Sequence, residues 1–204
     1  MKIVVAYKAG ESGNNTGMNI LVWPDSAMIR SGKPLFVPDG EMRIHPGLVT
    51  RINAVGKSIR HKFADRYFCE VAPAAFLLPL PASNRVSEEL DPYACDIAAD
   101  YTVVCGDFIP SEEVFQHEGD LSECSLTLSL ADLISRGEKT AECINVINVP
   151  DSLLRDAIVA ASERNTLKTG DLAGFIFRDS CKATPETLLT VTVDGKQLLK
   201  NKLK

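Results

Sequence analysis

Residues 48–57 read LVTRINAVGK, and they decide which kind of fold the chain adopts. From Leu48 to Val55 the stretch is rich in β-branched side chains, a pattern typical of a buried strand. Ser58 follows and is expected to cap a short helix. The apolar side chains of that helix recur at every fourth position: Ile59, Phe63 and Tyr67. A buried strand that leads into a short helix is therefore predicted here.

Strand patterns dominate the rest of the chain. Further strands are predicted at residues 1–6, 71–78 and 101–109. One hairpin is predicted with its turn at Ser31-Gly32, between residues 27–30 and 34–37. A second is predicted with its turn at Asp194-Gly195, between residues 188–193 and 196–199. Residues 79–93 predict a loop, and Pro46-Gly47 predicts a bend or bulge in a strand.

One more helix is predicted directly after Pro150. Asp151 is expected to cap it. Its apolar side chains form one face: Leu153, Leu154, Ala157, Ile158 and Ala161. Because no regular helices separate the predicted strands, the pattern favours a largely antiparallel or mixed sheet over a doubly wound fold. The predicted fold class is therefore α+β and strand-rich.

Length and charge limit the organisation and the partners. A chain of 204 residues can bury one core, so a single domain is expected over residues 1–204. The net charge of −5 comes from scattered acids, which argues against a nucleic-acid partner. The longest apolar stretch, residues 71–80, is too short to cross a bilayer, and the N-terminal apolar run is too short for a signal peptide. A cytoplasmic protein without a membrane partner is expected.

The six cysteines are spread along the chain and include no C-x-x-C pair. A zinc site needs closely spaced ligand pairs, so reduced and mostly buried thiols are expected instead. Cys105 has no histidine beside it in the sequence to act as a base, and it is therefore assigned to the core.

Four stretches together carry a resemblance to a known family. They are PDSA at 24–27 followed by GKP at 32–34, LVTRINAVGK at 48–57, FADRYF at 63–68 and TLKTGDL at 166–172. In order and spacing they resemble the fumarylacetoacetate hydrolase family. This resemblance implies a mixed β-roll core with short peripheral helices and a homodimer. It also implies hydrolysis, decarboxylation or hydration of acylpyruvates and related 2-keto acids around Mg²⁺ or Mn²⁺. It runs from about Asp25 to the end, so residues 1–24 are expected to form a divergent N-terminal strand and lid region.

The resemblance also places the metal ligands of that family on this chain. Its Glu-x-Glu pair falls on His45 and Gly47, and its third carboxylate, an Asp, falls on Phe76. Its Lys falls on Ile97, and its lid His-x-x-Glu pair falls within residues 7–19, which contain no histidine. Carboxylates are the usual ligands of Mg²⁺, which polarises keto-acid oxygens and stabilises an enolate. No metal and no other cofactor is therefore predicted for this chain.

Several polar residues remain as weaker candidates. His45 could bind a transition metal or act as a base, although a structural histidine is the favoured interpretation. Asp100 matches a retained family Asp, as a weak catalytic candidate or as a partner of Arg51 or the backbone. Arg51 and Lys33 could contact a small carboxylate ligand or form ordinary surface ion pairs.

Three functional hypotheses stay open. The first is a pseudoenzyme of the fumarylacetoacetate hydrolase type that binds a small molecule or a partner protein. It is preferred because the three metal ligands, the Lys and the lid pair are replaced together. The second is a working hydrolase, lyase or isomerase on acylpyruvates or related 2-keto acids, for which fold resemblance is the support. The third is a structural subunit that pairs with an active paralogue.

Overall fold

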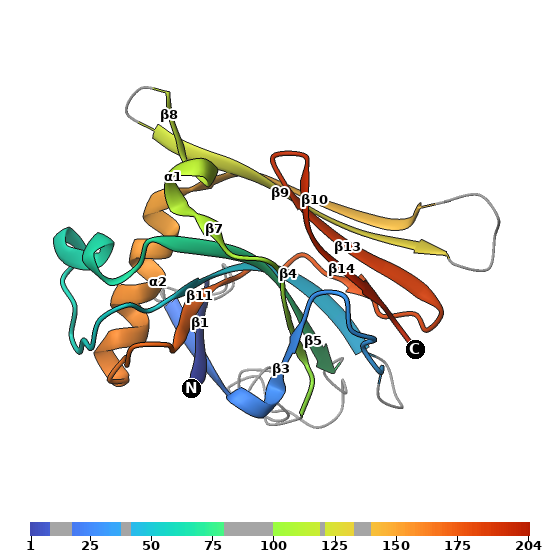
Figure 1. The fold of residues 1–204 in the computed structure, drawn as a ribbon, viewed down its shortest axis with the longest axis horizontal. Helices are drawn as coiled ribbons and strands as arrows, with labels where there is room; N and C mark the ends of the chain where they lie inside the picture. Colours follow the sequence, from blue (N-terminus) through green and yellow to red (C-terminus); the bar gives the residue numbers. More distant parts are fainter. Residues whose placement is uncertain (9–17, 38–41, 80–99, 119–120, 133–139) are drawn as a thin grey trace, which may run out of the picture.

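The computed structural model describes residues 1–8, 18–37, 42–79, 100–118, 121–132 and 140–204, in which two packed sheets are accompanied by one long helix (Figure 1). The larger sheet contains β1 (Lys2–Lys8), β2 (Met18–Pro24), β3 (Met28–Arg30), β4 (Met42–Arg51), β5 (Glu70–Pro79), β6 (Val103–Cys105), β7 (Ile109–Pro110), β11 (Leu172–Ile176) and β12 (Cys181–Lys182). Its main order is β2-β1-β11-β4-β5-β6-β3, with β12 beside β4 and β7 beside β5. β1 runs parallel to β11 and β3 parallel to β6, whereas the other pairs are antiparallel.

The smaller sheet is antiparallel throughout. It contains β8 (Gln116–Glu118), β9 (Leu121–Asp132), β10 (Thr140–Pro150), β13 (Thr187–Val193) and β14 (Lys196–Lys202). Its order is β10-β9-β13-β14, with β8 beside β9. The helices are α1 (Ser111–Val114), α2 (Asp151–Arg164) and the 3₁₀ segments η1 (Asp25–Ala27) and η2 (His61–Tyr67). Within the described ranges, no helix is long and apolar enough to span a membrane.

Side chains along the larger sheet alternate between two cores, as the period of a strand requires. On one face, β4 contributes Ile44 to a core shared with Leu128 of the smaller sheet. At one end of that face α2 and η2 pack on the sheet, and Ile158 meets Ile52 there. The opposite face, called the inner face below, carries a separate apolar cluster. Its buried members include Ile3, Val5, Trp23, Val49, Phe76 and Leu172.

Several predictions from the sequence are confirmed. The fold is strand-rich and its larger sheet is mixed. Asp194-Gly195 forms the turn between β13 and β14, and both residues have positive φ, as a tight hairpin turn requires. The predicted face of α2 is buried. Pro150 rather than Asp151 occupies the N-cap position, and the Asp151 side chain instead pairs with Arg155.

The predicted hairpin at Ser31-Gly32 is wrong. The chain does turn at Gly32, where φ is +86°, but β3 pairs in parallel with β6 instead of with the residues after the turn. Those residues pair with the end of the chain, since Leu35 bridges Leu203 and the Gly32 N–H donates to the Lys200 carbonyl. The segments on both sides of the turn therefore pair with distant parts of the chain instead of with each other. No local sequence pattern predicts these partners.

The predicted cap at Ser58 is also wrong. Ser58 has a φ of +51°, and the helix begins after Arg60 as a 3₁₀ segment, not as an α-helix. The reason is α2: the Ser58 N–H donates to the Ser162 carbonyl and the Ile59 N–H donates to Ser162 Oγ. These contacts with a distant helix hold the segment in place of a local cap.

No bend or bulge interrupts β4 at Pro46-Gly47. Pairing with β5 stays in register through Pro46, which faces Ala75. On the other side of β4, pairing with β11 ends at Gly47 and pairing with β12 begins at Ile44. Pro46, which has no N–H to donate, lies between these two paired stretches. Its carbonyl accepts a hydrogen bond from the Phe177 N–H. A proline is tolerated here because no ladder bond requires its nitrogen.

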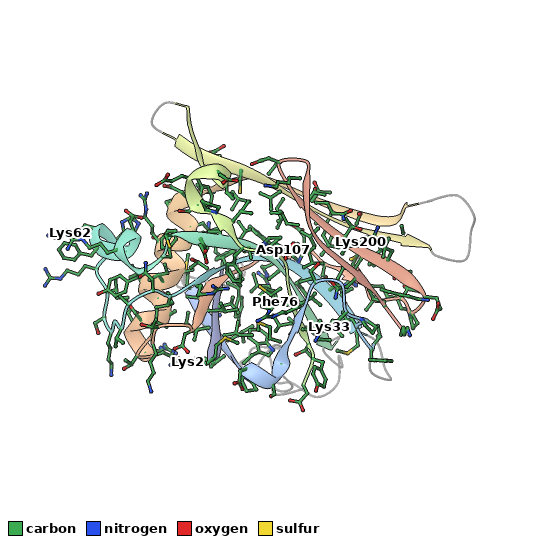
Figure 2. All side chains as sticks on the ribbon, viewed as in Figure 1. Lys2, Lys33, Lys62, Phe76, Asp107 and Lys200 are labelled. Carbon is green, nitrogen blue, oxygen red and sulfur yellow. The ribbon has the colours of Figure 1, made fainter. Side chains whose placement is uncertain are left out.

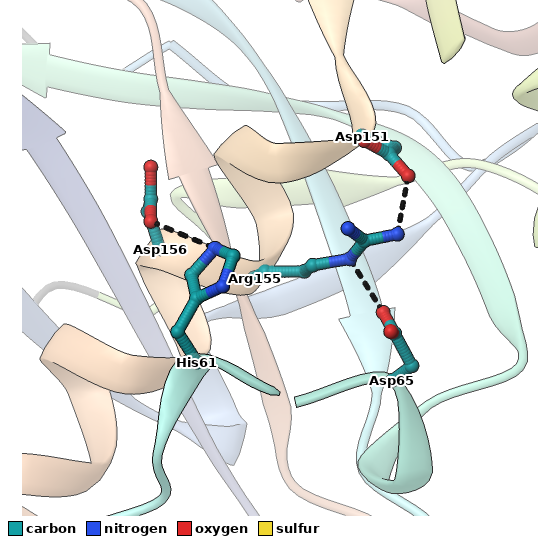
Figure 3. Close-up of polar contacts among 5 residues, drawn as sticks. All are labelled: His61, Asp65, Asp151, Arg155 and Asp156. Atoms are coloured by element: carbon teal, nitrogen blue, oxygen red, sulfur yellow. Dashed lines mark hydrogen bonds and ion pairs between the residues drawn. The ribbon is translucent and has the colours of Figure 1, made fainter. Parts of the chain in front are cut away.

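Charged side chains join η2 to α2 (Figure 3). Arg155 lies on α2, and its Nε is 2.6 Å from Asp65 Oδ1 of η2 while its Nη2 is 2.5 Å from Asp151 Oδ2. Beside it, His61 Nε2 lies 3.3 Å from Asp156 Oδ1. One arginine thus spans two elements far apart in the sequence.

Replacing Arg155 with Met is expected to lower the free energy of unfolding by about 1 kcal/mol, because two partly exposed ion pairs are lost. The matched control is Arg164→Met, at an exposed arginine near the end of the same helix, with an expected change below about 0.5 kcal/mol. Urea unfolding followed by circular dichroism measures both. Equal effects of the two substitutions would contradict a bridging role for Arg155.

Candidate functional site

The structure brings His45, Gly47 and Phe76 together on the inner face. His45 of β4 lies directly opposite Phe76 of β5, and Gly47 lies two residues further along β4. A Cβ atom added to Gly47 would lie 2.7 Å from Phe76 Cε2 and 2.5 Å from the Phe175 carbonyl oxygen. The Phe76 ring therefore covers the space into which a side chain at position 47 would project.

Phe76, labelled in Figure 2, is completely buried and belongs to the apolar cluster of the inner face. Its ring centroid is 5.3 Å from that of Trp23, in a tilted arrangement typical of packed aromatic pairs. At positions 47 and 76, where the resemblance places two of the three metal-binding carboxylates, the space is thus filled by the Phe76 ring.

His45 is the one polar side chain among the three positions. It is 4% exposed, and its Nδ1 lies 3.1 Å from the Phe177 carbonyl, so Nδ1 carries the proton that is donated. Burial lowers the pKa of His45 below its ordinary 6.5, and the imidazole is therefore neutral near pH 7. A void of about 10 Å³ adjoins the ring, lined by Tyr7, Leu21, His45, Ile176, Phe177 and Arg178. Such a void holds a single water at most.

The residues present do not fit a hard divalent cation. A phenyl ring and a glycine offer no ligand atom, and one neutral imidazole is a poor match for Mg²⁺, which prefers several oxygen ligands. Across the described ranges, no group of three His, Cys, Asp or Glu side chains is placed to hold a metal ion. No step of metal-assisted chemistry is therefore derived for this site.

The other candidates are Ile97, Asp100, Arg51 and Lys33. Ile97 is outside the described residues. Asp100 is exposed, and the hydrogen bond considered between Asp100 and Arg51 is not formed. Arg51 instead lies 3.5 Å from Glu70 and stacks over the Phe108 ring, 4.4 Å from its centroid. Lys33 is exposed in the turn after β3 (Figure 2).

Among the cysteines, Cys105 is buried and unpaired, as expected for a core residue. Burial raises its pKa to about 12, far from the range of a reactive thiolate. Cys124 has its pKa raised to about 12 for the same reason. Cys181 is also buried, whereas Cys69 is exposed, in line with the expectation of mostly buried thiols.

A cleft of about 540 Å³ opens at the other end of the inner face. Charged and aromatic side chains line part of it: Arg30, Arg51, Asp107 and Phe108. The sequence pointed to Arg51 but not to Arg30 or Asp107. Arg30 and Asp107 line the same cleft because β3 pairs with β6. This parallel pairing joins segments far apart in the sequence, and no motif in the sequence predicts it.

The buried state of His45 predicts a pH dependence of stability. The unfolded chain takes up a proton at His45 as the pH falls through 6.5, whereas the folded chain resists protonation because its pKa is lowered. Wild type should therefore lose stability on acidification below pH 6.5 until the folded pKa is reached. The contribution of this group has a slope of at most about 1.4 kcal/mol per pH unit.

The His45→Gln variant isolates this contribution, because every other titrating group is common to both proteins. Urea unfolding between about pH 7.5 and 5.5 should show a steeper loss of stability in wild type than in the variant. Parallel pH profiles for the two proteins would mean that His45 is not held neutral in the folded state.

Comparison with known proteins gives a likeness in structure alone. No sequence profile of a known family matches the chain, and no curated protein matches it. Among solved structures, one from Yersinia pestis, assigned to the fumarylacetoacetate hydrolase family, has 18% identity and a TM-score of 0.76, covering 100% of this chain and 92% of its own. Fumarylpyruvate hydrolase from Pseudomonas aeruginosa, in complex with Mn²⁺ and pyruvate, has 17% identity and a TM-score of 0.75, covering 100% and 89%.

A third neighbour is 5-carboxymethyl-2-hydroxymuconate delta-isomerase from Mycobacterium smegmatis, with 15% identity, a TM-score of 0.73 and coverage of 99% and 78%. At such identities the likeness establishes the fold and leaves the chemistry open. It confirms the fold expected from the four sequence stretches. The chain therefore has the fold of the fumarylacetoacetate hydrolase family.

Proposed function

We propose that this chain is a non-catalytic binding protein built on the fumarylacetoacetate hydrolase fold. The observation that carries this proposal is the Phe76 ring packed over Gly47, opposite His45. The resemblance places the three carboxylate ligands of the family's metal at these positions. Apolar packing at this site supports a protein that retains the fold, with apolar side chains that stabilise it in place of metal ligands that would catalyse a reaction.

Turnover is the test. The purified chain is incubated with an acylpyruvate such as acetylpyruvate in the presence of Mg²⁺ or Mn²⁺, and loss of the enol absorbance is followed. Fumarylpyruvate hydrolase from Pseudomonas aeruginosa, assayed on fumarylpyruvate, serves as the positive control. We expect no rate above the metal-only background. Turnover that a chelator abolishes and that scales with protein concentration would overturn the proposal.

The second candidate is a hydrolase or isomerase acting on acylpyruvates or related 2-keto acids. The likeness of the whole chain to a fumarylpyruvate hydrolase and to an isomerase favours it. It requires that the chain recruit ligands other than His45, Gly47 and Phe76. The same turnover assay separates the two candidates.

The oligomeric state tests both the expected homodimer and the alternative of a structural subunit that pairs with an active paralogue. Light scattering on the purified chain measures its mass, and 44 kDa, twice the 22.2 kDa of one chain, is expected for the homodimer. A monomer that recovers a larger mass only with an active homologue would favour the structural-subunit alternative.

A further inference from the structure

The cleft of about 540 Å³ lies at the end of the inner face remote from His45. Strand β4 connects the two places, with His45 in its first half and Arg51 as its last residue. Six residues of extended strand separate them by roughly 20 Å. The cleft is therefore a separate place from the packed site, although the same sheet builds both.

Its walls suit a small organic molecule. Leu172 and Cys105 belong to the apolar cluster of the inner face, and Met28 and Phe108 pack against that cluster. These side chains form the apolar part of the lining. The volume lies within the range of about 300–1,000 Å³ that is usual for small-molecule sites, which combine an apolar lining with a few placed polar groups.

Three charged side chains line the cleft, two positive and one negative, and Met1, whose N-terminal ammonium lies 3.9 Å from Asp25, lines it as well. Arg51 lies 3.5 Å from Glu70, and its guanidinium stacks over the Phe108 ring, 4.4 Å from the ring centroid. Arg30 and Asp107 are exposed, and within the described ranges neither forms an ion pair. Opposite charges that line one cleft without pairing are complementary to a ligand that carries both signs.

The backbone around these groups is fixed before any ligand arrives. The Ser31 N–H donates to the Cys105 carbonyl at 3.0 Å, and the Gly106 N–H donates to the Pro73 carbonyl at 2.9 Å. The Asp107 N–H donates to the Leu198 carbonyl at 3.0 Å. The segments that carry Arg30 and Asp107 are thus tied to each other and to β14, which reduces the ordering cost of binding.

We propose that this cleft binds a small zwitterionic carboxylate, of the class of a free amino acid. Arg30 and Arg51 receive its carboxylate, for which a guanidinium offers paired donors. Asp107 receives its ammonium group, and Phe108, Leu172 and Met28 contact its apolar part. This inference goes beyond the proposed function, since it requires no chemistry at His45 and holds for a catalytic chain equally well.

The experiment uses the whole chain and the standard L-amino acids as probes. Isothermal titration calorimetry measures affinity, and ¹H–¹⁵N spectra report whether the amides of Ser31, Gly106 and Asp107 shift. For the best ligand, two analogues of the same skeleton follow, one without the amine and one without the carboxylate. For leucine these are 4-methylpentanoate and 3-methylbutan-1-amine. We expect each analogue to bind about tenfold to a hundredfold more weakly than the amino acid.

Two pairs of variants complete the test. Arg30→Gln and Asp107→Asn should each weaken the best ligand by about tenfold to a hundredfold. Their controls, Arg60→Gln and Glu163→Gln, make the same charge changes at exposed positions outside the cleft and should change affinity less than about twofold. Circular dichroism melts verify that all four fold.

Three results would overturn the inference: no saturable binding of any amino acid, binding that both cleft variants leave intact, or an analogue without the amine that binds as tightly as the amino acid. Turnover of an acylpyruvate by wild type would contradict the proposed non-catalytic function but not the proposed amino-acid site. The two proposals are therefore tested independently.

Discussion

The Phe76→Asp variant is expected to be largely unfolded, with a loss of more than about 4 kcal/mol in the free energy of unfolding. The side chain is completely buried among apolar neighbours, with the Trp23 ring 5.3 Å away. A carboxylate introduced there loses its hydration and gains no metal. A loss of this size is comparable with the whole stability of many domains.

The control for this variant is Phe76→Leu, which keeps an apolar side chain and should cost about 1–2 kcal/mol. Trp23 is the single tryptophan of the chain and lies against Phe76, so its fluorescence follows unfolding in urea directly. Adding Mn²⁺ should not rescue the Asp variant. A Phe76→Asp protein as stable as Phe76→Leu would show that this part of the inner face is hydrated.

Gly47→Ala has the second-largest expected effect, a loss of about 2–3 kcal/mol. In an ordinary strand position the same change is neutral or stabilising, because alanine has less freedom in the unfolded chain. Here the new methyl group meets the Phe175 carbonyl oxygen at 2.5 Å and the Phe76 ring at 2.7 Å. The first of these contacts is backbone, so a side-chain rotation cannot relieve it.

The double variant Gly47→Ala with Phe76→Leu tests which contact matters. The smaller leucine should relieve part of the clash, so the double variant should be less destabilised than the sum of the two single variants. Urea unfolding of all four proteins gives this difference. Strict additivity would mean that the Phe76 ring does not occupy the space above Gly47.

The sequence predicted those parts of the fold that local pattern controls. The face of α2 and the turn at Asp194-Gly195 depend on periodicity or on turn chemistry. A strand does include Leu48, but it runs from Met42 to Arg51, so the bounds predicted from Leu48 to Val55 are wrong. The predictions failed where a distant partner overrides a local signal. Ser58 is held by Ser162 of α2, and the turn at Gly32 joins segments that pair with β6 and with the end of the chain.

The hairpin of β9 and β10 was not among the predicted elements, although its signal is present. In β9 the buried residues Leu126, Leu128 and Leu130 alternate with Thr and Ser, the period of a strand with one covered face. For the candidate site, too, the sequence predicted one part and not the other. Positions 45, 47 and 76 follow from a resemblance, whereas the packing of the Phe76 ring over Gly47 and the cleft between Arg30 and Asp107 depend on contacts between strands.

Titration of the purified chain with Mn²⁺, followed by electron paramagnetic resonance, tests most directly whether apolar packing has replaced the metal centre. We expect no saturable binding at concentrations up to about 1 mM, above the range of weak protein sites for divalent cations. Fumarylpyruvate hydrolase from Pseudomonas aeruginosa, whose structure holds Mn²⁺, should bind the ion in a parallel titration. Stoichiometric Mn²⁺ binding by this chain, displaced by Mg²⁺ and unaffected by His45→Gln, would show that oxygen ligands elsewhere in the chain form a metal centre, and the proposed loss of metal binding would then be wrong.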